Sequence, residues 1–144
     1  MEIQSTLIDY DKVFRAIEGL TDIEKDQTIK AGLRAATNVF LRAGRSNLRA
    51  RLKGNKNTGN INKSFRSKLK RSKLGAIGGF NQLGMHAHLL DMGTVNRTTR
   101  SGANRGRMIA NNFWTDAINT NQNTAISKVY EGIERGIQRI IMRG

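Results

Sequence analysis

The short segment His86–Thr94 carries both histidines of the chain, together with one aspartate. In an extended strand, His86 and His88 would point to the same face, with Asp91 three residues beyond His88. Imidazole and carboxylate groups can bind metals or act in general acid–base catalysis. Two histidines do not complete a metal site, however, and the chain has no cysteine and no carboxylate cluster near them. We therefore expect structural roles for both histidines and no metal site.

Other catalytic patterns are also missing. A Walker phosphate-binding loop needs Gly-Lys-Ser or Gly-Lys-Thr after a strand, and the lysine-rich segment 54–73 lacks it. The serines occur in no nucleophile-elbow context. A metal-dependent nuclease would need more carboxylates than Asp91 and Asp116 in this half of the chain. The sequence therefore predicts a protein that is not an enzyme and binds no cofactor.

Length and composition set further limits. The chain has 144 residues, 38% of them hydrophobic, with no proline and no cysteine. One domain spanning residues 1–144 is the natural expectation for this length, and the lack of proline suits long helices. No apolar run approaches the roughly 18 residues of a membrane span, and the start of the chain lacks the features of a signal peptide. We therefore expect that the protein is made in the cytoplasm and that it does not associate with a membrane.

The charge of +14 is unevenly distributed along the chain. Residues 1–26 carry a net charge of −4, whereas residues 27–90 hold fourteen bases and no acid. Residues 91–144 carry a net charge of +4. A field of one sign on this scale favours a polyanionic partner, such as nucleic acid, an anionic membrane or an acidic protein face.

The elements that must position these residues begin with two predicted helices. Apolar residues three and four apart predict an amphipathic helix over Leu7–Leu20. Thr21 and Glu24 form a capping box that starts a long helix over Asp22–Leu52. The helix dipole, which favours cations near a helix C-terminus, could account for part of the basic run in the last turns of this helix. This run consists of Arg42, Arg45, Arg49, Arg51 and Lys53.

A small antiparallel sheet of about three strands is predicted between residues 62 and 94. The glycine- and asparagine-rich segment 54–60 reads as a loop, and the periodicity of 61–70 does not separate helix from strand. Gly75–Phe80 is predicted to be a strand, Leu83–Gly84 a turn, and His86–Asp91 a buried strand released by Gly93.

The remaining chain is predicted to contain a basic loop and a long helix. Residues 95–107 hold four arginines, two glycines and no acid, which is typical of an extended flexible loop. A final helix is expected from about Asn112 to Met142. Its Gly132 and Gly136 could permit close packing against another helix, or could simply weaken the end of this helix. The fold class is therefore α+β, with long N- and C-terminal helices packed on the small sheet and long basic loops.

Three short motifs, taken together and in order, resemble the tail-component family of tailed double-stranded DNA phages. That family also covers tail-completion and head–tail joining (neck) proteins. The motifs are Gly59–Ser64, a Gly-Asn-hydrophobic-x-x-Ser pattern; His86–Thr94, with His86 for the usual tyrosine and Asp91 for the usual glutamate; and Asn112–Ala117, which lacks the usual proline.

The resemblance implies a structural virion protein, made in the host cytoplasm, that forms a ring at the head–tail junction or the proximal tail end. Such a ring would join head to tail around the DNA channel, as a homo-oligomer for which a hexamer is favoured over a dodecamer. Its partners would be other neck or tail proteins and the passing phage DNA, contacted without base readout.

Two sets of basic residues are the candidate contacts for a partner or for DNA. The first, in the arginine loop, consists of Arg97, Arg100, Arg105 and Arg107. The second consists of Lys56, Lys63, Arg66, Lys68, Lys70, Arg71 and Lys73.

Three other interpretations stay open. Either basic set could serve solubility alone. The chain could be a non-specific nucleic-acid-binding protein outside the virion, although its scarce aromatics are not interleaved with the basic residues. A membrane-surface protein ranks last, because a basic helix with bulky aromatic residues is missing.

Overall fold

A computed structural model describes residues 15–52, 59–71 and 75–143 of this α+β protein. Its described chain is mostly helical, with one sheet of two strands. The chain divides into two units, and the single domain expected over residues 1–144 stays a prediction. Unit 1 takes in the described residues up to Phe40, Ser67–Gly78, and those from Asn121 onward; unit 2 takes in Leu41–Arg66 and Gly79–Thr120, where described.

The long helix α2 spans Asp22–Arg51, as the sequence predicts. Its capping box forms: the Thr21 N–H donates to Glu24 Oε2 at 2.8 Å, and the Glu24 N–H donates to Thr21 Oγ1 at 3.4 Å. These bonds satisfy N–H groups that a helix start leaves without partners. Residues 15–18 are also helical, while most of the predicted helix Leu7–Leu20 lies outside the described residues.

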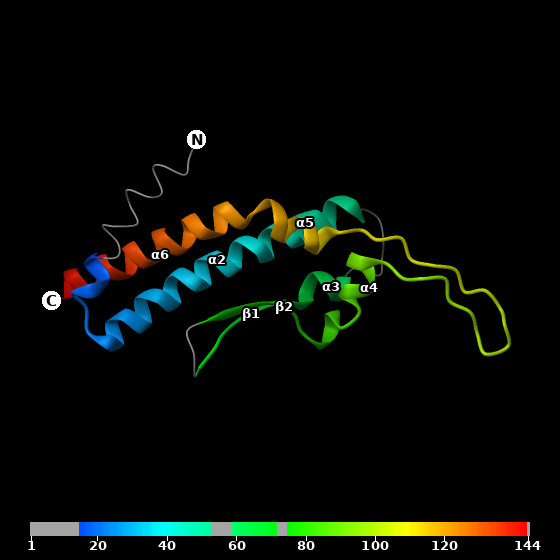
Figure 1. Ribbon diagram of the computed structural model, residues 1–144, viewed down its shortest axis with the longest axis horizontal. Coiled ribbons are helices and arrows are strands. Elements are labelled where there is room, and N and C mark those ends of the chain that lie inside the picture. Colours follow the sequence, from blue (N-terminus) through cyan, green and yellow to red (C-terminus); the bar gives the residue numbers. More distant parts are fainter. Residues whose placement is uncertain (1–14, 53–58, 72–74, 144) are drawn as a thin grey trace. The chain divides into compact units, whose positions relative to one another are not determined.

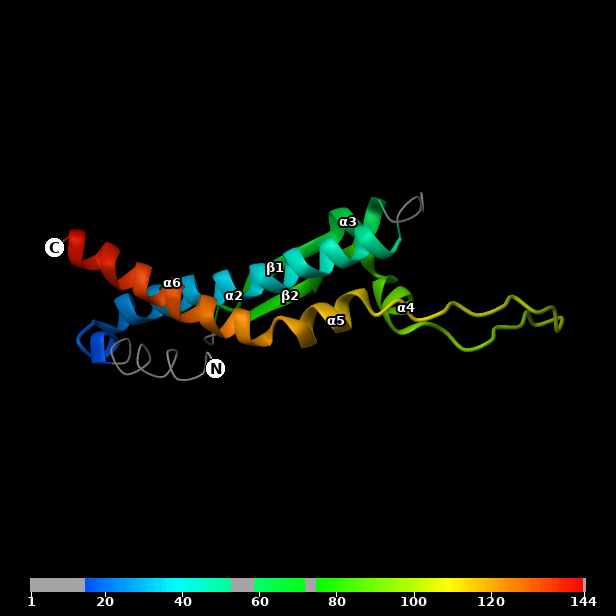
Figure 2. The same ribbon diagram turned by 90° about the horizontal axis from the view of Figure 1, so that it is seen from above.

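In unit 1, helix α6, which spans Gln122–Arg143, lies along the first half of α2 (Figures 1 and 2). The two backbones meet at glycines. A Cβ atom built on Gly132 would lie 2.7 Å from the Cα of Gly32, and one on Gly136 would lie 3.1 Å from the Thr28 side chain. Of the two roles considered for Gly132 and Gly136, the structure shows close packing against another helix. Buried Ile133 and Ile137 of α6 form an apolar cluster with Ile17 and Leu20, which precede α2.

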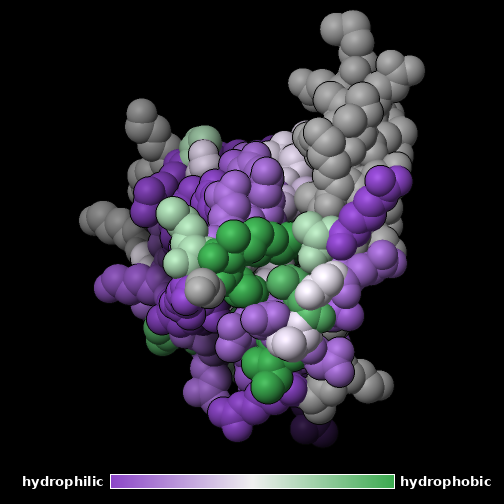
Figure 3. Space-filling view, turned by 90° about the vertical axis from the view of Figure 1, so that its left-hand side faces the viewer, coloured by the Kyte–Doolittle hydropathy of each residue, from purple (hydrophilic) through white to green (hydrophobic). Residues whose placement is uncertain are grey.

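One end of unit 1, where α2 begins and α6 ends, carries an apolar area within a largely hydrophilic face (Figure 3). Exposed large hydrophobic residues of these helices include Ile23, Ile141 and Met142. A soluble face usually carries such residues singly, so this area is a candidate contact surface.

The sheet is a hairpin of β1, Phe65–Leu69, and β2, Ala76–Phe80. The Lys70 N–H donates to the Gly75 carbonyl, and the Asn81 N–H donates to the Ser64 carbonyl, both at 2.9 Å, so the strands are antiparallel. The β2 prediction is confirmed. The ambiguous segment 61–70 contains both alternatives, because helix α3, Gly59–Ser64, leads directly into β1. The predicted loop 54–60 is therefore helical at its last two residues, and 53–58 lie outside the described part.

The predicted strand His86–Asp91 is wrong, and with it the three-stranded sheet. The segment forms helix α4, Ala87–Met92, after the short 3₁₀ turn η2, Gln82–Gly84. Ala87 and Asp91 are its buried residues, four apart, which is the helical rather than the strand spacing. A short apolar run does not separate these two possibilities by periodicity.

The predicted helix from Asn112 to Met142 is two helices, α5, Phe113–Thr120, and α6. The Thr120 hydroxyl donates to the Asp116 carbonyl, and the Asn121 carbonyl accepts the first hydrogen bond of α6 from Ala125. Threonine and asparagine compete with backbone hydrogen bonds and favour helix ends. The break therefore falls in the polar run around Asn121.

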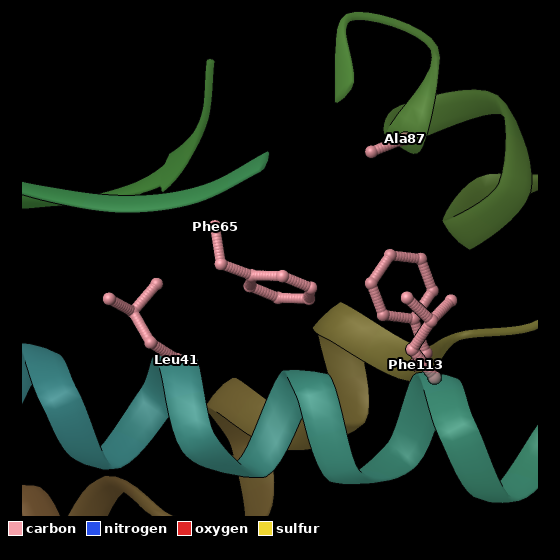
Figure 4. Close-up of a cluster of buried hydrophobic side chains, with 5 residues drawn as sticks. Leu41, Phe65, Ala87 and Phe113 are labelled. Atoms are coloured by element: carbon pink, nitrogen blue, oxygen red, sulfur yellow. The ribbon is translucent and has the colours of Figure 1, made fainter. Parts of the chain in front are cut away.

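The core of unit 2 is an apolar cluster on α2, α4, α5 and the start of β1. Leu48 and Phe113 are fully buried, and Leu41, Phe65 and Ala87 are nearly so. Their side chains converge in Figure 4. The rings of Phe80 and Trp114 complete an aromatic group, with centroids 4.8 to 6.3 Å apart in its contacting pairs. Such edge and tilted contacts add to the apolar burial.

Candidate functional site: an arginine arm

Between α4 and α5 the chain forms a long two-stranded extension, which we call the arginine arm (residues 94–108; Figure 1). The Thr94 N–H donates to the Met108 carbonyl at 2.9 Å, and Arg97 and Gly106 are bonded in the same way at 2.9 Å. The predicted loop is thus extended, as expected, but its two sides are held together by antiparallel backbone hydrogen bonds rather than left free.

The tip of the arm is a tight turn. The Gly102 N–H donates to the Thr99 carbonyl at 2.9 Å, and the Thr99 N–H donates to the Ala103 carbonyl at 2.8 Å. Gly102 has a φ of 85°, and the Thr99 hydroxyl also accepts from the Ala103 N–H at 3.0 Å. A three-residue loop whose last residue is left-handed is a common way to close a hairpin.

Asp91 clamps the base of the arm. Its carboxylate is 5% exposed and accepts three hydrogen bonds from the start of α5. These come from the Trp114 N–H at 2.8 Å, the Thr115 N–H at 3.1 Å and the Thr115 hydroxyl at 2.6 Å. A carboxylate at a helix N-terminus meets unpaired N–H groups and the positive end of the helix dipole. The end of α4 is thereby fixed to the start of α5.

The backbone completes the clamp. The Asn112 N–H donates to the Asp91 carbonyl at 2.9 Å, and the Asn111 N–H donates to the Leu90 carbonyl at 3.0 Å. Asn112 has a φ of 57°, the positive value that asparagine tolerates better than most residues. Proline, whose φ is held near −65°, could not occupy this conformation. Asparagine at this position therefore fits the backbone, whereas the proline of the motif that the sequence resembles would not.

The four predicted arm residues, Arg97, Arg100, Arg105 and Arg107, all lie on the arginine arm and are all exposed. None of them forms an ion pair with a described carboxylate. The sequence of unit 2 contains only two acids. Asp91 is buried in the clamp, and Asp116 pairs with Arg51 at 2.7 Å. The carboxylates of unit 2 are thus engaged, and an anionic partner for the arm must come from outside this unit.

Exposed apolar residues stand where the arm joins its unit. Val95 is 82% exposed, Ile109 79% and Met92 72%. Residues 92–96 and 107–110 line an open hollow of about 640 Å³ there. The arm therefore offers apolar contacts near its base and positive charge along its length, a combination suited to a protein partner.

The second predicted basic set divides between the units. Lys63 and Arg66 belong to unit 2, while Lys68, Lys70 and Arg71 belong to unit 1, and each of the five is exposed. Lys56 and Lys73 lie outside the described residues. The set is thus divided between the two units, and its role as a contact surface stays a prediction.

Three arginines that the sequence interpretation assigned to the helix dipole form a surface of their own. Arg42, Arg45 and Arg49 lie on one side of α2 and border an open hollow of about 590 Å³. The Arg45 guanidinium lies 5.2 Å from the centroid of the Phe65 ring. Their spacing of three and four residues was visible in the sequence, but it was read only as a charged helix end.

The histidines do not form a site. His86 and His88 are both exposed, and because they lie at and just inside the start of α4, they do not share a face. His88 Nδ1 lies 3.0 Å from the Met85 carbonyl oxygen. Across the described residues, no three histidine, aspartate or glutamate side chains are grouped so as to hold a metal ion. Among the described helices, none is both long and apolar enough to cross a membrane.

The three motifs of the family resemblance all fall in unit 2. Helix α3, the first motif, contacts η2, and α4 of the second motif contacts α5 of the third. Phe113 and Ala117 of the third motif are fully buried. In comparisons with known proteins, no family model, curated protein or solved structure matches the chain.

Proposed function

We propose that this protein is a non-enzymatic structural virion protein that forms a ring at the head–tail junction or the proximal end of a phage tail. The ring joins head to tail around the DNA channel and is built from copies of this chain, with a hexamer favoured over a dodecamer. The observation that supports this most is the arginine arm, clamped at its base and without a carboxylate partner in its own unit.

The arm has the properties of a contact element. A two-stranded hairpin without a packed apolar face has marginal stability in water on its own. The outer edge of each side also leaves backbone N–H and carbonyl groups open to pairing with another chain. Docking of the arm on a neighbouring subunit or ring would cover these edges and the exposed Val95 and Ile109.

The test is assembly of an arm variant. Replacing Arg97, Arg100, Arg105 and Arg107 with glutamine removes four charges without touching the clamp. We expect the wild type to form rings by light scattering and electron microscopy, and the variant to keep its circular dichroism spectrum but assemble poorly.

The matched control removes the same number of charges from exposed positions of unit 1. It replaces Arg15, Arg34, Arg139 and Arg143 with glutamine, and none of these residues belongs to the arm. The control should assemble like the wild type. If the wild-type protein stays monomeric even when it is mixed with purified neck or tail proteins, the ring proposal is contradicted. If both variants lose ring assembly equally, a specific role for the arm is contradicted.

The second candidate function is a non-specific nucleic-acid-binding protein outside the virion. The observation that favours it is the unbalanced charge of unit 2, whose carboxylates are both engaged. The two functions differ in assembly: a strictly monomeric protein that binds DNA tightly at physiological salt supports the second and contradicts the first.

A further inference from the structure

We propose that Arg42, Arg45 and Arg49 of α2, here called the α2 stripe, bind the phosphodiester backbone of nucleic acid. This inference rests on the proposed function for the source of the DNA. It deepens that function by naming the surface of the protein that contacts DNA. It gives the DNA contact to a rigid helix and leaves the arginine arm for protein contacts.

The geometry of the stripe fits a linear array of phosphates. The three arginines stand at positions i, i+3 and i+7 of a 30-residue helix, so they lie on one side of it. With a rise of about 1.5 Å per residue, they are about 4.5 and 6 Å apart along the helix axis. A DNA strand presents one phosphate per about 3.4 Å of its axis, which is the same scale.

The stripe is held by the packed side of the same helix. Leu41, Gly44 and Leu48 face the core of unit 2, and a Cβ atom on Gly44 would lie 2.7 Å from the Trp114 ring. This close contact fixes the rotation of α2. Arg42 and Arg49, which lie on the flank beside this packed side, are therefore exposed to solvent, while Arg45 is half-buried. Arg45 is further oriented by its position over the Phe65 ring.

The chemistry around the stripe favours a backbone of phosphates over an acidic protein. The stripe forms no ion pair with a described carboxylate. Ser46 and Ala50, which are small, line the hollow together with the three arginines and leave room for a strand to approach. No large exposed hydrophobic residue belongs to the α2 part of unit 2. A protein interface would normally bury apolar anchors, whereas arginine alone suffices for phosphate.

The experiment measures binding of fluorescent duplex DNA by anisotropy over a series of salt concentrations. The logarithm of the affinity falls with the logarithm of salt by about 0.9 per phosphate contact. The R42Q/R45Q/R49Q variant should therefore lose about 2.7 from the magnitude of this slope. A control with the same charge change, R34Q/R139Q/R143Q, should keep the wild-type slope.

Two further measurements keep the inference open to refutation. If the triple variant does not fold, R42Q/R49Q leaves Arg45 on Phe65 and should lose about 1.8 from the slope. Ring formation by the same variants is scored separately, so that loss of DNA binding with intact rings supports the stripe alone.

Three outcomes would overturn the inference. Wild-type protein that binds no DNA at low salt is one, and equal slope losses in the stripe and control variants is another. The third concerns competition for the labelled DNA. If polyglutamate displaces it as effectively as unlabelled DNA of equal total charge does, the stripe would be assigned to an acidic protein.

Discussion

At the scale of single residues, Asp91 determines how the arginine arm is attached. Its carboxylate joins residues more than twenty positions apart in the sequence, through the Trp114 and Thr115 N–H groups and the Thr115 hydroxyl. A buried carboxylate is stable only when its oxygens are hydrogen-bonded, and here all three bonds come from one helix start.

Replacing Asp91 with alanine should destabilise unit 2 strongly. Hydrogen bonds to a charged group contribute about 1.5 to 3 kcal/mol each, and buried N–H groups would lose their partner, so we expect a loss of about 3 kcal/mol or more. Urea unfolding followed by circular dichroism measures it. Asp91→Asn, which keeps the shape, should cost less.

The control for this prediction is Asp116→Ala. Asp116 is also a carboxylate of unit 2, but its side chain is 46% exposed and its partner Arg51 is 35% exposed. Such a pair contributes at most about 1 kcal/mol. An Asp91→Ala variant that is no less stable than Asp116→Ala would show that the clamp contributes little.

Gly93 supports a second residue-scale prediction. Its φ is 75°, and a Cβ atom there would lie 2.8 Å from both the Ala110 nitrogen and the Met108 oxygen. Gly93→Ala should therefore cost about 1 to 3 kcal/mol. Gly102→Ala, with a φ of 85° but open space around it, should lose only the conformational part, about 1 kcal/mol. Thermal unfolding compares the two, and equal losses would mean that the contacts at Gly93 relax.

Some of these residue roles could be read from the sequence and others could not. Thr21 and Glu24 are three residues apart, and the local rule for a capping box predicted their bonds correctly. Asp91 was considered as a metal-binding or catalytic carboxylate and as the acidic position of a motif, but not as a hydrogen-bond acceptor for a helix start. Its partners lie across the arm, and no local pattern connects a carboxylate with a helix start more than twenty residues later.

At the scale of elements, α2 and α6 can cross closely because Gly32 and Gly132 have no side chains at the crossing point. A Cβ atom on Gly132 would lie 2.7 Å from Gly32 Cα, and one on Gly32 would lie 2.5 Å from the Val129 carbonyl oxygen. Because both obstacles are backbone atoms, the helices would have to move apart.

Gly132→Ala should therefore destabilise unit 1 by about 1 to 3 kcal/mol, even though alanine favours an isolated helix by about 1 kcal/mol over glycine. Chemical denaturation measures the change. Gly79→Ala is the control, since nothing lies within 4 Å of a Cβ atom there. A Gly132→Ala variant as stable as the wild type would contradict the close contact.

Among the elements, α2 and β2 were predicted well, whereas the long predicted C-terminal helix is divided into α5 and α6. The start of α2 is as predicted and its end differs by one residue, because a capping box and thirty residues of continuous pattern specify it. The strand β2 is also confirmed. The short segments were harder: α4 was mistaken for a strand because Leu89 and Leu90 fit either periodicity. The arm was taken for a free loop, since its hydrogen bonds involve backbone atoms that carry no sequence signal.

At the scale of the whole molecule, charge is the dominant feature. The chain carries +14, and the two acids of unit 2 are both engaged by other groups. Repulsion among the remaining cations opposes the folded state. Salt shortens the range of this repulsion from about 30 Å at 0.01 M to about 10 Å at 0.1 M.

The melting temperature should consequently rise as sodium chloride increases from low to physiological concentration. Differential scanning fluorimetry measures it, and the R42Q/R45Q/R49Q variant should show a smaller rise because it carries three fewer charges. A melting temperature that falls with added salt would mean that ion pairs such as Arg51–Asp116 outweigh the repulsion.

The tip of the arginine arm also provides a place for chemical labelling. The chain contains no cysteine, so Ser101→Cys would introduce a single thiol. Ser101 is exposed at the turn, where its hydroxyl is hydrogen-bonded to that of Thr99 at 2.9 Å. A fluorophore or spin label there would report the surroundings of the tip without altering the clamp or the core. Its mobility, followed during assembly or on addition of DNA, would show when the tip becomes enclosed and by which partner.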